Sequence, residues 1–467
     1  MSVTVASVGV MTDQNAAQPS DLSDLSALDA GTVPLDPAST AALAAVGLTY
    51  RKVDVAGEDF DRFALAMDRG FLGQRGTPEQ LEGFRGAMDG RRPIGVFDDA
   101  AVESGVPVAT VDTWVEEVTV DVGRVLPMWA ISGVTVSPTH RRRGIARAML
   151  EGELRSAAAA GFPIAGLTVS EATIYGRYGF GQAATATSWS VDARRAGWIG
   201  PRPTEGERPG RIDPIEREHA REDVTALHDV VRRGRPGEIR AWANLWRFTV
   251  GLGAGQEGAA KVRAVRYTDA DGVRRGVLVY EIENHPDDFT KNTLAVRSLI
   301  ADGPEAYAAL WRFALTHDLV ATVKAELLSA DEPLRWLIAD TRAATVTERD
   351  HHWLRVLDVA ACLEARTYRV PGAVTFVVSD PVGLTDGAWT LTIDEDGAGS
   401  VTAGEAGAGA GGHEVHLGIA ELSALLVGGV RATTLRAAGR VECDGDAASW
   451  LDVALAPLAQ PRLSVWY

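Results

Sequence analysis

Cysteine is almost absent from this 467-residue sequence, which contains only Cys362 and Cys443. Two cysteines cannot build a disulfide framework, and their scarcity is typical of proteins that fold in a reducing compartment. No apolar run approaches the roughly 18 residues that a membrane-spanning helix needs. The first basic residue is Arg51, so the basic segment that opens a secretory signal peptide is missing. The sequence therefore predicts a cytoplasmic protein that does not act at a membrane.

Basic residues are also scarce, with 46 Lys and Arg against 63 Asp and Glu and a net charge of -17. Nucleic-acid binding needs a basic face, so we predict no nucleic-acid partner. An acidic cleft concentrates cations, and the charge therefore suits a cationic small-molecule substrate. General solubility is the more ordinary explanation of the same charge.

The length suggests about three domains, at roughly 100–200 residues each. Residues 1–45 hold no aromatic residue and are rich in Ala, Ser and Asp, which predicts a disordered tail. A Pro- and Gly-rich linker follows at 201–210, and a softer boundary loop is expected near 349–352. We therefore expect a tail (1–45), a first unit (46–203), a second unit (204–353) and a third unit (354–467).

The first two units show the same order of elements. In the first unit, strand 128–136, helix 143–160 and strand 164–169 follow one another, although Glu153 interrupts the apolar face of the helix. In the second, strand 293–300, helix 304–317 and strand 319–327 follow at similar spacing. This repeat indicates an internal duplication. The third unit has an α+β pattern, and its apolar end, 461–467, predicts a docked terminus.

One segment carries an anion-binding signal, Val134–Arg147, which joins a strand to a helix and includes an R-x-x-G-x-A pattern. Backbone N–H groups at a helix N-terminus are free and the helix dipole is positive there. Small residues at Gly144 and Ala146 let a diphosphate approach the backbone, and arginines add positive charge. The pattern predicts a diphosphate site.

Two segments resemble the Eis (enhanced intracellular survival) family of GNAT acyltransferases. Val134–Arg147 is similar to the pyrophosphate loop of GNAT enzymes. Ser170–Gly181, with the letters SEATIYGRYGFG, resembles the family segment S-E-x-x-I-Y-G-R-[FY]-G-[FY]-G. The order of the units is similar too. The resemblance implies an α/β fold (α+β mixed sheets) with tandem GNAT domains, the second degenerate, followed by a sterol-carrier-protein-like domain.

The resemblance implies a function and a set of site residues. The function is transfer of acetyl from acetyl-CoA to an amine of a polybasic acceptor (an aminoglycoside, a polyamine or a lysine-like group) by a homohexamer, with no metal. Backbone contacts to acetyl-CoA would come from Val134, Thr135 and Val136. The pyrophosphate would lie on Arg142, Arg143, Gly144, Ile145, Ala146 and Arg147, and the pantetheine side on Ser170 and Glu171. Tyr175 stands at the position of the general acid, and the terminal carboxylate of Tyr467 at that of the general base.

Acetyl transfer needs a base for the amine and an acid for the departing thiolate. A tyrosine hydroxyl, with an unperturbed pKa of about 10, holds its proton at neutral pH and can donate it. Tyr175 and Tyr178 are both candidates, and the motif favours Tyr175. Strand 128–136 carries no carboxylate, so the base is the Tyr467 carboxylate, Glu171 or a water molecule.

Other segments receive less weight. Asp350, His351 and His352 resemble a metal cluster but lack partners at ligand spacing, which favours a boundary loop. The loop 301–305 has two acids and no arginine, so we predict that the second unit does not bind CoA. Glu116 and Glu117 are weak candidates for substrate contacts. Two alternative functions remain: a lipid or sterol carrier with a vestigial GNAT unit, and a GNAT enzyme with a longer acyl-CoA donor.

Overall fold

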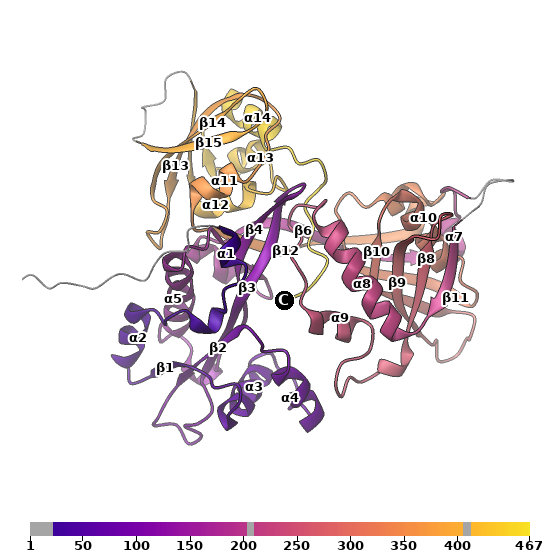
Figure 1. Ribbon diagram of the computed structural model, residues 1–467, viewed down its shortest axis with the longest axis horizontal. Coiled ribbons are helices and arrows are strands. Elements are labelled where there is room, and N and C mark those ends of the chain that lie inside the picture. Colours follow the sequence, from indigo (N-terminus) through magenta and orange to yellow (C-terminus); the bar gives the residue numbers. More distant parts are fainter. Residues whose placement is uncertain (1–21, 203–209, 405–411) are drawn as a thin grey trace, which may run out of the picture.

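The computed structural model describes residues 22–202, 210–404 and 412–467, and arranges them in three lobes (Figure 1). The expected linker at 201–210 falls mostly outside these residues. The N-terminal lobe comprises residues 22–188, the central lobe residues 189–202 and 210–343, and the C-terminal lobe residues 357–467, because Trp189, Val191 and Ala196 pack in the core of the central lobe. The last residue lies near the centre of the molecule, between the lobes (Figure 1). Among the described helices, none is both long and apolar enough to cross a membrane.

A twelve-stranded sheet runs through the N-terminal and central lobes. Its strands, in spatial order, are β1 (Thr49–Lys52), β2 (Arg91–Phe97), β3 (Ala109–Asp121), β4 (Arg124–Val136), β5 (Ile164–Thr168), β12 (Ala344–Val356), β6 (Gly181–Asp192), β11 (Val320–Leu328), β10 (Asn292–Ala301), β9 (Arg274–Glu283), β8 (Val262–Thr268) and β7 (Arg211–Ile215). The helices of these lobes are α1 (Leu22–Leu25), α2 (Pro37–Ala44), α3 (Glu58–Gly70), α4 (Pro78–Arg85), α5 (Ile145–Ala159), α6 (Ala172–Tyr175), α7 (Ala193–Ala196), α8 (Arg217–Arg232), α9 (Ala243–Thr249) and α10 (Pro304–Leu315).

Strand β12 corrects the expected boundary between the second and third units. Instead of a loop at 349–352, the chain runs as a continuous strand to Val356. It pairs antiparallel with β5 on one side and β6 on the other, so a strand that follows the central lobe completes the sheet of the N-terminal lobe. Pairing partners so distant in sequence leave no local signal, because the strand pattern alone does not say which sheet it joins.

The expectation of a disordered tail is wrong for residues 22–45. This segment forms α1 and α2, and Leu25, Ala30 and Leu43 are buried in the core of the N-terminal lobe. Asp36 caps α2, because its carboxylate accepts a hydrogen bond from the Ser39 amide at 2.8 Å. A few well-spaced apolar side chains therefore order this segment despite its polar composition.

The predicted repeat of strand, helix and strand is confirmed. In the N-terminal lobe it is β4, α5 and β5, and in the central lobe it is β10, α10 and β11. Both strand pairs are parallel. A tight turn at residues 269–272 joins β8 to β9.

The C-terminal lobe is α+β, as expected. Its five-stranded sheet has the order β15 (Gly399–Gly404), β14 (Gly387–Ile393), β13 (Gly372–Ser379), β16 (His413–Gly418) and β17 (Val441–Glu442). Its helices are α11 (Val359–Glu364), α12 (Ile419–Leu425), α13 (Ala432–Ala437) and α14 (Gly445–Ala454).

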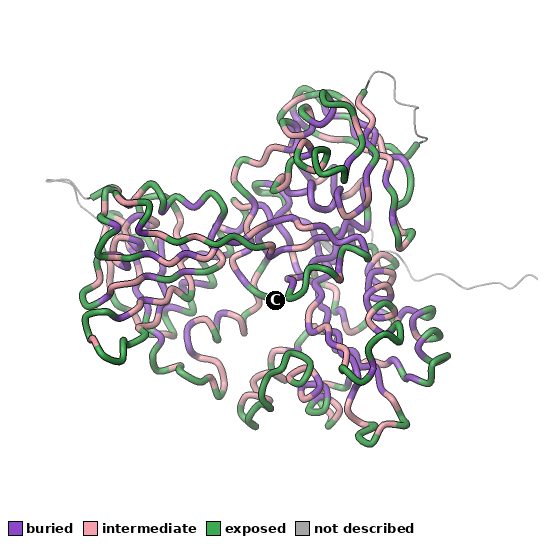
Figure 2. Tube along the Cα trace, turned by 180° about the vertical axis from the view of Figure 1, so that it is seen from behind, coloured by how far each residue is buried: buried purple, intermediate pink, exposed green. Residues whose placement is uncertain are grey.

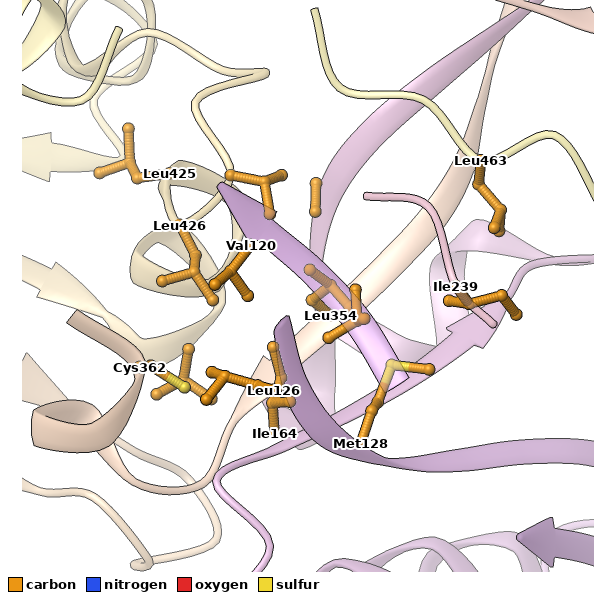
Figure 3. Packing of buried hydrophobic residues seen from close by; sticks show 14 of the residues in the cluster. Val120, Leu126, Met128, Ile164, Ile239, Leu354, Cys362, Leu425, Leu426 and Leu463 are labelled. Atoms are coloured by element: carbon orange, nitrogen blue, oxygen red, sulfur yellow. The ribbon is translucent and has the colours of Figure 1, made fainter. Parts of the chain in front are cut away.

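One apolar core joins the lobes at their junction. Val120 and Leu126 from β3 and β4 pack with Leu425 and Leu426 of the C-terminal lobe (Figure 3). The end of the chain joins the same core through Leu463. Buried positions follow the central strands, and exposed ones follow the outer loops (Figure 2). The predicted docking of the C-terminus is confirmed, since Leu463 and Val465 are buried.

Candidate active site

The candidate site begins where β4 and β5 separate. The two strands pair only over Met128–Ala130 and Ile164–Gly166. Beyond Ala130, β4 continues to Val136 and pairs with β3 alone, so its other edge has no strand partner in the described chain. Backbone N–H and C=O groups need hydrogen-bond partners. This free edge can therefore bind an extended ligand, as sheet edges bind peptides.

A β-bulge shapes the free edge. Thr110 and Asp112 of β3 lie opposite Thr135 and Ser132, so two residues of β4, one of them Gly133, face a single residue of β3. Gly133 has φ +60, which favours glycine. The Thr110 hydroxyl donates to the Gly133 carbonyl at 2.7 Å and lies 2.7 Å from the Thr135 hydroxyl. Bulges bend a strand and redirect it, commonly beside active sites.

The loop after β4 leads to an uncapped helix. Gly144 precedes α5 with φ +79, and no side chain caps the helix. Arg142 also has a positive φ of 64. Arg142 and Arg143 are exposed and form no ion pair with any described residue. The positive helix end and the unpaired arginines can together attract an anion.

His140 holds this loop in place. Its Nε2 atom lies 3.0 Å from the Asp98 carboxylate, and its Nδ1 atom lies 2.8 Å from the Thr139 hydroxyl. The hydrogen bond from His140 lowers the pKa of Asp98 below its ordinary value. The loop therefore keeps its shape without using the N–H groups of α5.

A cavity of about 130 Å³ lies in the fork between β4 and β5. It is lined by the free edge of β4, the end of β5, α6 and the end of the chain. The lining residues are Phe71, Ile131, Ser132, Gly133, Val134, Leu167, Thr168, Ser170, Tyr175, Trp466 and Tyr467. Tyr175 and Tyr467, to which the resemblance assigned acid and base catalysis, thus line one cavity.

Tyr175 ends the short helix α6 and is 7% exposed. Its hydroxyl makes no hydrogen bond within the described chain, which leaves it available to a ligand in the cavity. Burial, with smaller contributions from the charges of Glu171 and Tyr178, raises its pKa to about 12. The hydroxyl therefore stays protonated at neutral pH and can act as a proton donor.

The other candidates on this side lie differently. Ser170 lines the cavity, whereas Glu171 is exposed and is absent from its lining. Tyr178 is buried on the turn that follows α6 and is also absent from the lining. Of the two candidate tyrosines, Tyr175 lines the cavity and Tyr178 does not. Of the two residues suggested as base, Tyr467 lines the cavity and Glu171 does not.

Tyr467 reaches the cavity at the end of a docked segment. The Thr168 hydroxyl donates a hydrogen bond to the main-chain oxygen of Tyr467. The Tyr467 ring packs edge-to-face against Trp114, with ring centroids 5.6 Å apart. Burial, reinforced by the charge of Glu116, raises the pKa of its phenol well above the ordinary value. The chain end is thereby fixed beside the last residue of β5.

Glu116 and Glu117 are engaged in ion pairs with the central lobe. Arg240 lies 3.2 Å from Glu116, and Arg232 lies 2.8 Å from Glu117. Burial, only partly offset by Arg240, raises the pKa of Glu116 to about 7. In the described chain, these two carboxylates therefore connect the N-terminal and central lobes, and neither residue lines the cavity.

Three contributors to the site were missed by the sequence analysis. Thr168 holds the chain end, and His351 and His352 lie in strand β12 beside the final residues. The prediction of a boundary loop for the two histidines is wrong, because they lie within β12. A signal was present, because Trp353, Leu354 and Val356 are typical of a strand that could have been extended backwards. Among the described residues, no group of three or more His, Cys, Asp or Glu side chains is placed to hold a metal.

Comparison with known families agrees with this architecture. Residues 50–183 match an acetyltransferase (GNAT) domain, and residues 237–356 match a second acetyltransferase (GNAT) domain. Residues 359–464 match a sterol carrier protein domain. The second match extends to the end of β12, which agrees with the corrected boundary.

Several relatives span most of the chain. An uncharacterized N-acetyltransferase of Streptomyces avermitilis is 35% identical over 416 residues, 85% of this chain and 93% of the relative. The N-acetyltransferase Eis of Mycobacterium tuberculosis is 33% identical over 337 residues, 71% of this chain and 79% of Eis. The crystal structure of Eis1 from Mycobacterium abscessus superposes with a TM-score of 0.74 at 26% identity, covering 90% of this chain and 100% of Eis1. The chain therefore belongs to the Eis-like GNAT N-acetyltransferases and is an acetyltransferase.

Proposed function

We propose that this enzyme transfers the acetyl group of acetyl-CoA to an amine of a polybasic acceptor. The observation that carries the proposal is the cavity in the fork of β4 and β5, because one small space is lined by a protonated tyrosine hydroxyl and by the chain end. The free edge of β4 and the uncapped end of α5 lead into it.

Acetyl-CoA binds along this path. Its pantetheine arm extends along the backbone of Val134, Thr135 and Val136, with Ser170 and Glu171 on the other side. Its pyrophosphate lies on the loop and first turn of α5, formed by Arg142, Arg143, Gly144, Ile145, Ala146 and Arg147. The support is physical: the strand edge lacks a partner, and the helix end is positive and uncapped.

The two catalytic roles follow from the protonation states. The Tyr467 carboxylate, ionised at neutral pH, accepts a proton from the acceptor amine. The amine nitrogen then attacks the thioester carbon, the carbon–sulfur bond breaks, and Tyr175 donates its proton to the departing thiolate. Tyr467 is preferred to Glu171 as base because it lines the cavity and Glu171 does not. A water molecule bound to the carboxylate could relay the proton.

The donor and acceptor rest on separate arguments. A cavity of about 130 Å³ suits an acetyl group better than a long acyl chain. The net charge of -17 favours a cationic acceptor such as a polyamine or an aminoglycoside. CoA release measured with acetyl-, hexanoyl- and palmitoyl-CoA, against a panel of polyamines and aminoglycosides, tests both. Faster turnover with palmitoyl-CoA would contradict the donor, and turnover confined to neutral amines would contradict the acceptor.

We also propose a cytoplasmic homohexamer, on the resemblance to the Eis family. Light scattering should then give six times the chain mass of 49.6 kDa. A monomer or dimer at micromolar concentration would contradict this assembly.

A carrier function for the C-terminal lobe is less well supported. The layer between its sheet and helices is filled by side chains of the lobe itself. The buried residues there include Val374, Phe376, Leu391, Val415, Leu422, Leu425 and Leu451. Such packing favours a structural role over a lipid-binding one. Stoichiometric binding of a fluorescent fatty acid, lost on removal of the C-terminal lobe, would support the carrier instead.

A further inference from the structure

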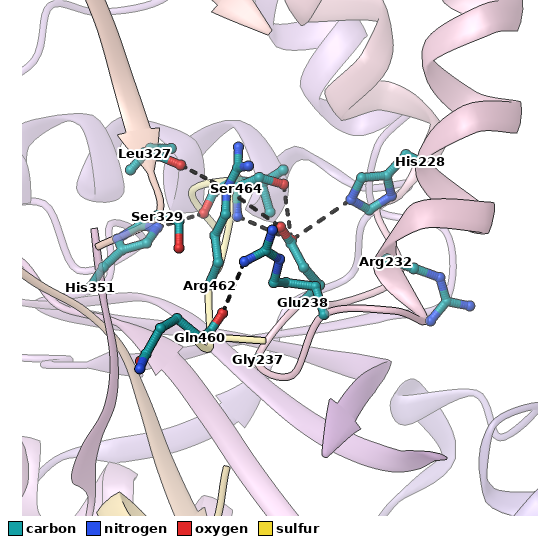
Figure 4. A network of polar contacts seen from close by, with 12 residues as sticks. His228, Arg232, Gly237, Glu238, Leu327, Ser329, His351, Gln460, Arg462 and Ser464 are labelled. Carbon is teal, nitrogen blue, oxygen red and sulfur yellow. Dashed lines mark hydrogen bonds and ion pairs between the residues drawn. The ribbon is translucent and has the colours of Figure 1, made fainter. Parts of the chain in front are cut away.

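The end of the chain is held by residues outside its own lobe. The Arg462 amide donates to the Pro236 carbonyl at 2.9 Å, and its guanidinium Nε donates to the Leu327 carbonyl at 3.0 Å. The amide and hydroxyl of Ser464 donate to the Glu238 carboxylate at 3.1 and 2.9 Å. Figure 4 shows Arg462 and Ser464 converging on Glu238. We call residues 462–467 the C-terminal strap. The central lobe forms the seat of its first part, through Arg462 and Ser464.

The fit between strap and seat is close. Gly237 has φ +85, and a Cβ atom placed on it would lie 2.9 Å from the Arg462 carbonyl oxygen. The seat lies beside the fork of β10 and β11, which pair only from Asn292 to Val296. A cavity of about 430 Å³ in this fork is lined by Arg462, Ser464 and Glu238 among others. The fork of β10 and β11 corresponds to the fork of β4 and β5, where acetyl-CoA is proposed to bind. The strap therefore borders the equivalent opening of the central lobe.

His351 binds the strap through one ring nitrogen. Its Nε2 atom lies 2.8 Å from the Val465 carbonyl oxygen. A carbonyl oxygen only accepts hydrogen bonds, so Nε2 carries the proton and donates. The ring is fully buried and packs edge-to-face on Trp466, with centroids 4.5 Å apart. His351 therefore fixes the two residues before Tyr467.

His352 binds the strap in the opposite tautomer. Its Nδ1 atom lies 2.9 Å from the Gly237 carbonyl oxygen, so Nδ1 carries the proton. Its Nε2 atom, 2.8 Å from the Tyr467 hydroxyl, must then accept a hydrogen bond from that hydroxyl. His352 lies opposite Thr168 across the β5–β12 pair, and Thr168 donates to the main-chain oxygen of Tyr467. His352 of β12 thus binds the hydroxyl of Tyr467, and Thr168 of the neighbouring β5 binds its main-chain oxygen.

A local irregularity in β12 explains how neighbouring histidines both reach the strap. Asp350 pairs with Thr185 and His352 pairs with Ala184, so His351 is an extra residue in the ladder. In a regular strand, adjacent side chains point to opposite faces. A bulge redirects one of them. Burial lowers the pKa of His351 to about 4 and that of His352 to about 3, so both stay neutral and keep their tautomers.

We propose that His351 and His352 are positioning residues that hold the terminal carboxylate of Tyr467 in the active site through two opposite, fixed tautomers. The proposal rests on the proposed role of that carboxylate as base. It also gives a reason for the insertion of β12 between β5 and β6, because this insertion places the histidines beside the end of β5. Neither histidine touches the reacting atoms; each acts through the strap.

A mutant cycle tests the link between His352 and Tyr467. His352→Leu removes the acceptor, and Tyr467→Phe removes the hydroxyl but keeps the carboxylate. Each should lower kcat about tenfold, the scale of one buried hydrogen bond, with the KM for acetyl-CoA unchanged. The double variant should be no worse than either single one, and His352→Gln, which keeps an acceptor oxygen, should recover most of the activity. Additive losses, or full activity of His352→Leu, would overturn the proposal.

A second measurement tests the strap without catalysis. Carboxypeptidase treatment of the full chain, followed by mass spectrometry, reports how often the strap leaves its seat. His351→Leu and His352→Leu should release Tyr467 about tenfold faster than the wild type. Trp353→Phe, on the same strand but packed against the core of the N-terminal lobe, is the matched control and should release Tyr467 at the wild-type rate. Equal rates of Tyr467 release from the wild type and from all three variants would refute the proposed role of the two histidines. Unchanged turnover after deletion of Tyr467, with faster release in the histidine variants, would instead refute only the base.

Discussion

The Arg92 guanidinium lies 2.5 Å from the Glu153 carboxylate, and both side chains are fully buried between α5 and the sheet. Glu153 also accepts hydrogen bonds from the hydroxyls of Tyr50 and Thr113, at 3.2 and 3.1 Å. Arg92 donates its remaining hydrogen bonds to the carbonyls of Val33 and Pro34. The carboxylate that interrupts the apolar face of α5 therefore fixes the helix whose N-terminus is the proposed pyrophosphate site, and the same network orders the segment before β1.

Glu153→Ala should lower the free energy of unfolding by about 3–5 kcal/mol, because it leaves the Arg92 charge buried and unpaired. Urea denaturation measures the change. Glu151→Ala, two residues earlier and paired with the partly exposed Arg155, is the matched control and should cost less than about 1 kcal/mol. Similar losses in both variants would mean that the buried pair does not fix the helix.

Gly144→Ala should weaken acetyl-CoA binding about tenfold. At φ +79 an added Cβ is strained, and it would project into the open space where the pyrophosphate is proposed to lie. Gly439→Ala, in the C-terminal lobe, is the matched control, since Gly439 has φ +69 and its added Cβ also meets nothing within 4 Å. Isothermal titration calorimetry compares the two. Equal affinities would place the pyrophosphate elsewhere.

The raised pKa of Glu116 predicts a pH dependence of stability. Burial raises this pKa from 4.5 to about 7, so the folded protein keeps a proton that the unfolded chain releases near pH 4.5. The stability that this group contributes is therefore present at low pH and is lost as pH rises toward 7. The loss is about 3 kcal/mol on the scale of 1.36 kcal/mol per pKa unit. Urea denaturation from pH 4.5 to 8 measures the free energy of unfolding, which should depend less on pH for Glu116→Gln than for the wild type. The same pH dependence in both proteins would refute this role of Glu116.

Calorimetry should also find one CoA per chain. In the central lobe, the loop after β10 carries Asp302, paired with Arg275 at 2.6 Å, and the first turn of α10 carries Glu305, which accepts a hydrogen bond from Tyr267. Acids at this helix start repel a diphosphate. A stoichiometry of two would show that the central lobe kept its cofactor site.

The sequence predicts local elements well and distant partners poorly. The strand, loop and helix around Gly144 could be predicted because periodicity and turn chemistry lie within a few residues. The SEATIYGRYGFG segment located Tyr175 through its resemblance to the Eis family, since a family motif is also read within a few residues. The insertion of β12, and with it the contacts of His351 and His352, could not be predicted, because strand pairing depends on residues more than a hundred positions away.

The ordering of residues 22–45 also depends on distant partners. Low aromatic content suggested disorder, yet the carbonyls of Val33 and Pro34 complete the hydrogen bonds of the buried Arg92. Amino-acid composition does not show which backbone carbonyls accept hydrogen bonds from a buried side chain distant in sequence. Glu153, an unexplained carboxylate on an apolar helix face, was the one sequence feature that hinted at a buried cation.

The most direct measurement is CoA release from acetyl-CoA with polyamine and aminoglycoside acceptors, for the wild type, Tyr175→Phe and a chain ending before Tyr467. If Tyr175 is the acid and the Tyr467 carboxylate is the base, the wild type turns over and each variant loses about 100-fold or more in kcat, the usual scale of acid–base catalysis. Both variants should still bind acetyl-CoA. A wild type that binds no acetyl-CoA, or variants that turn over at the wild-type rate, would contradict the account.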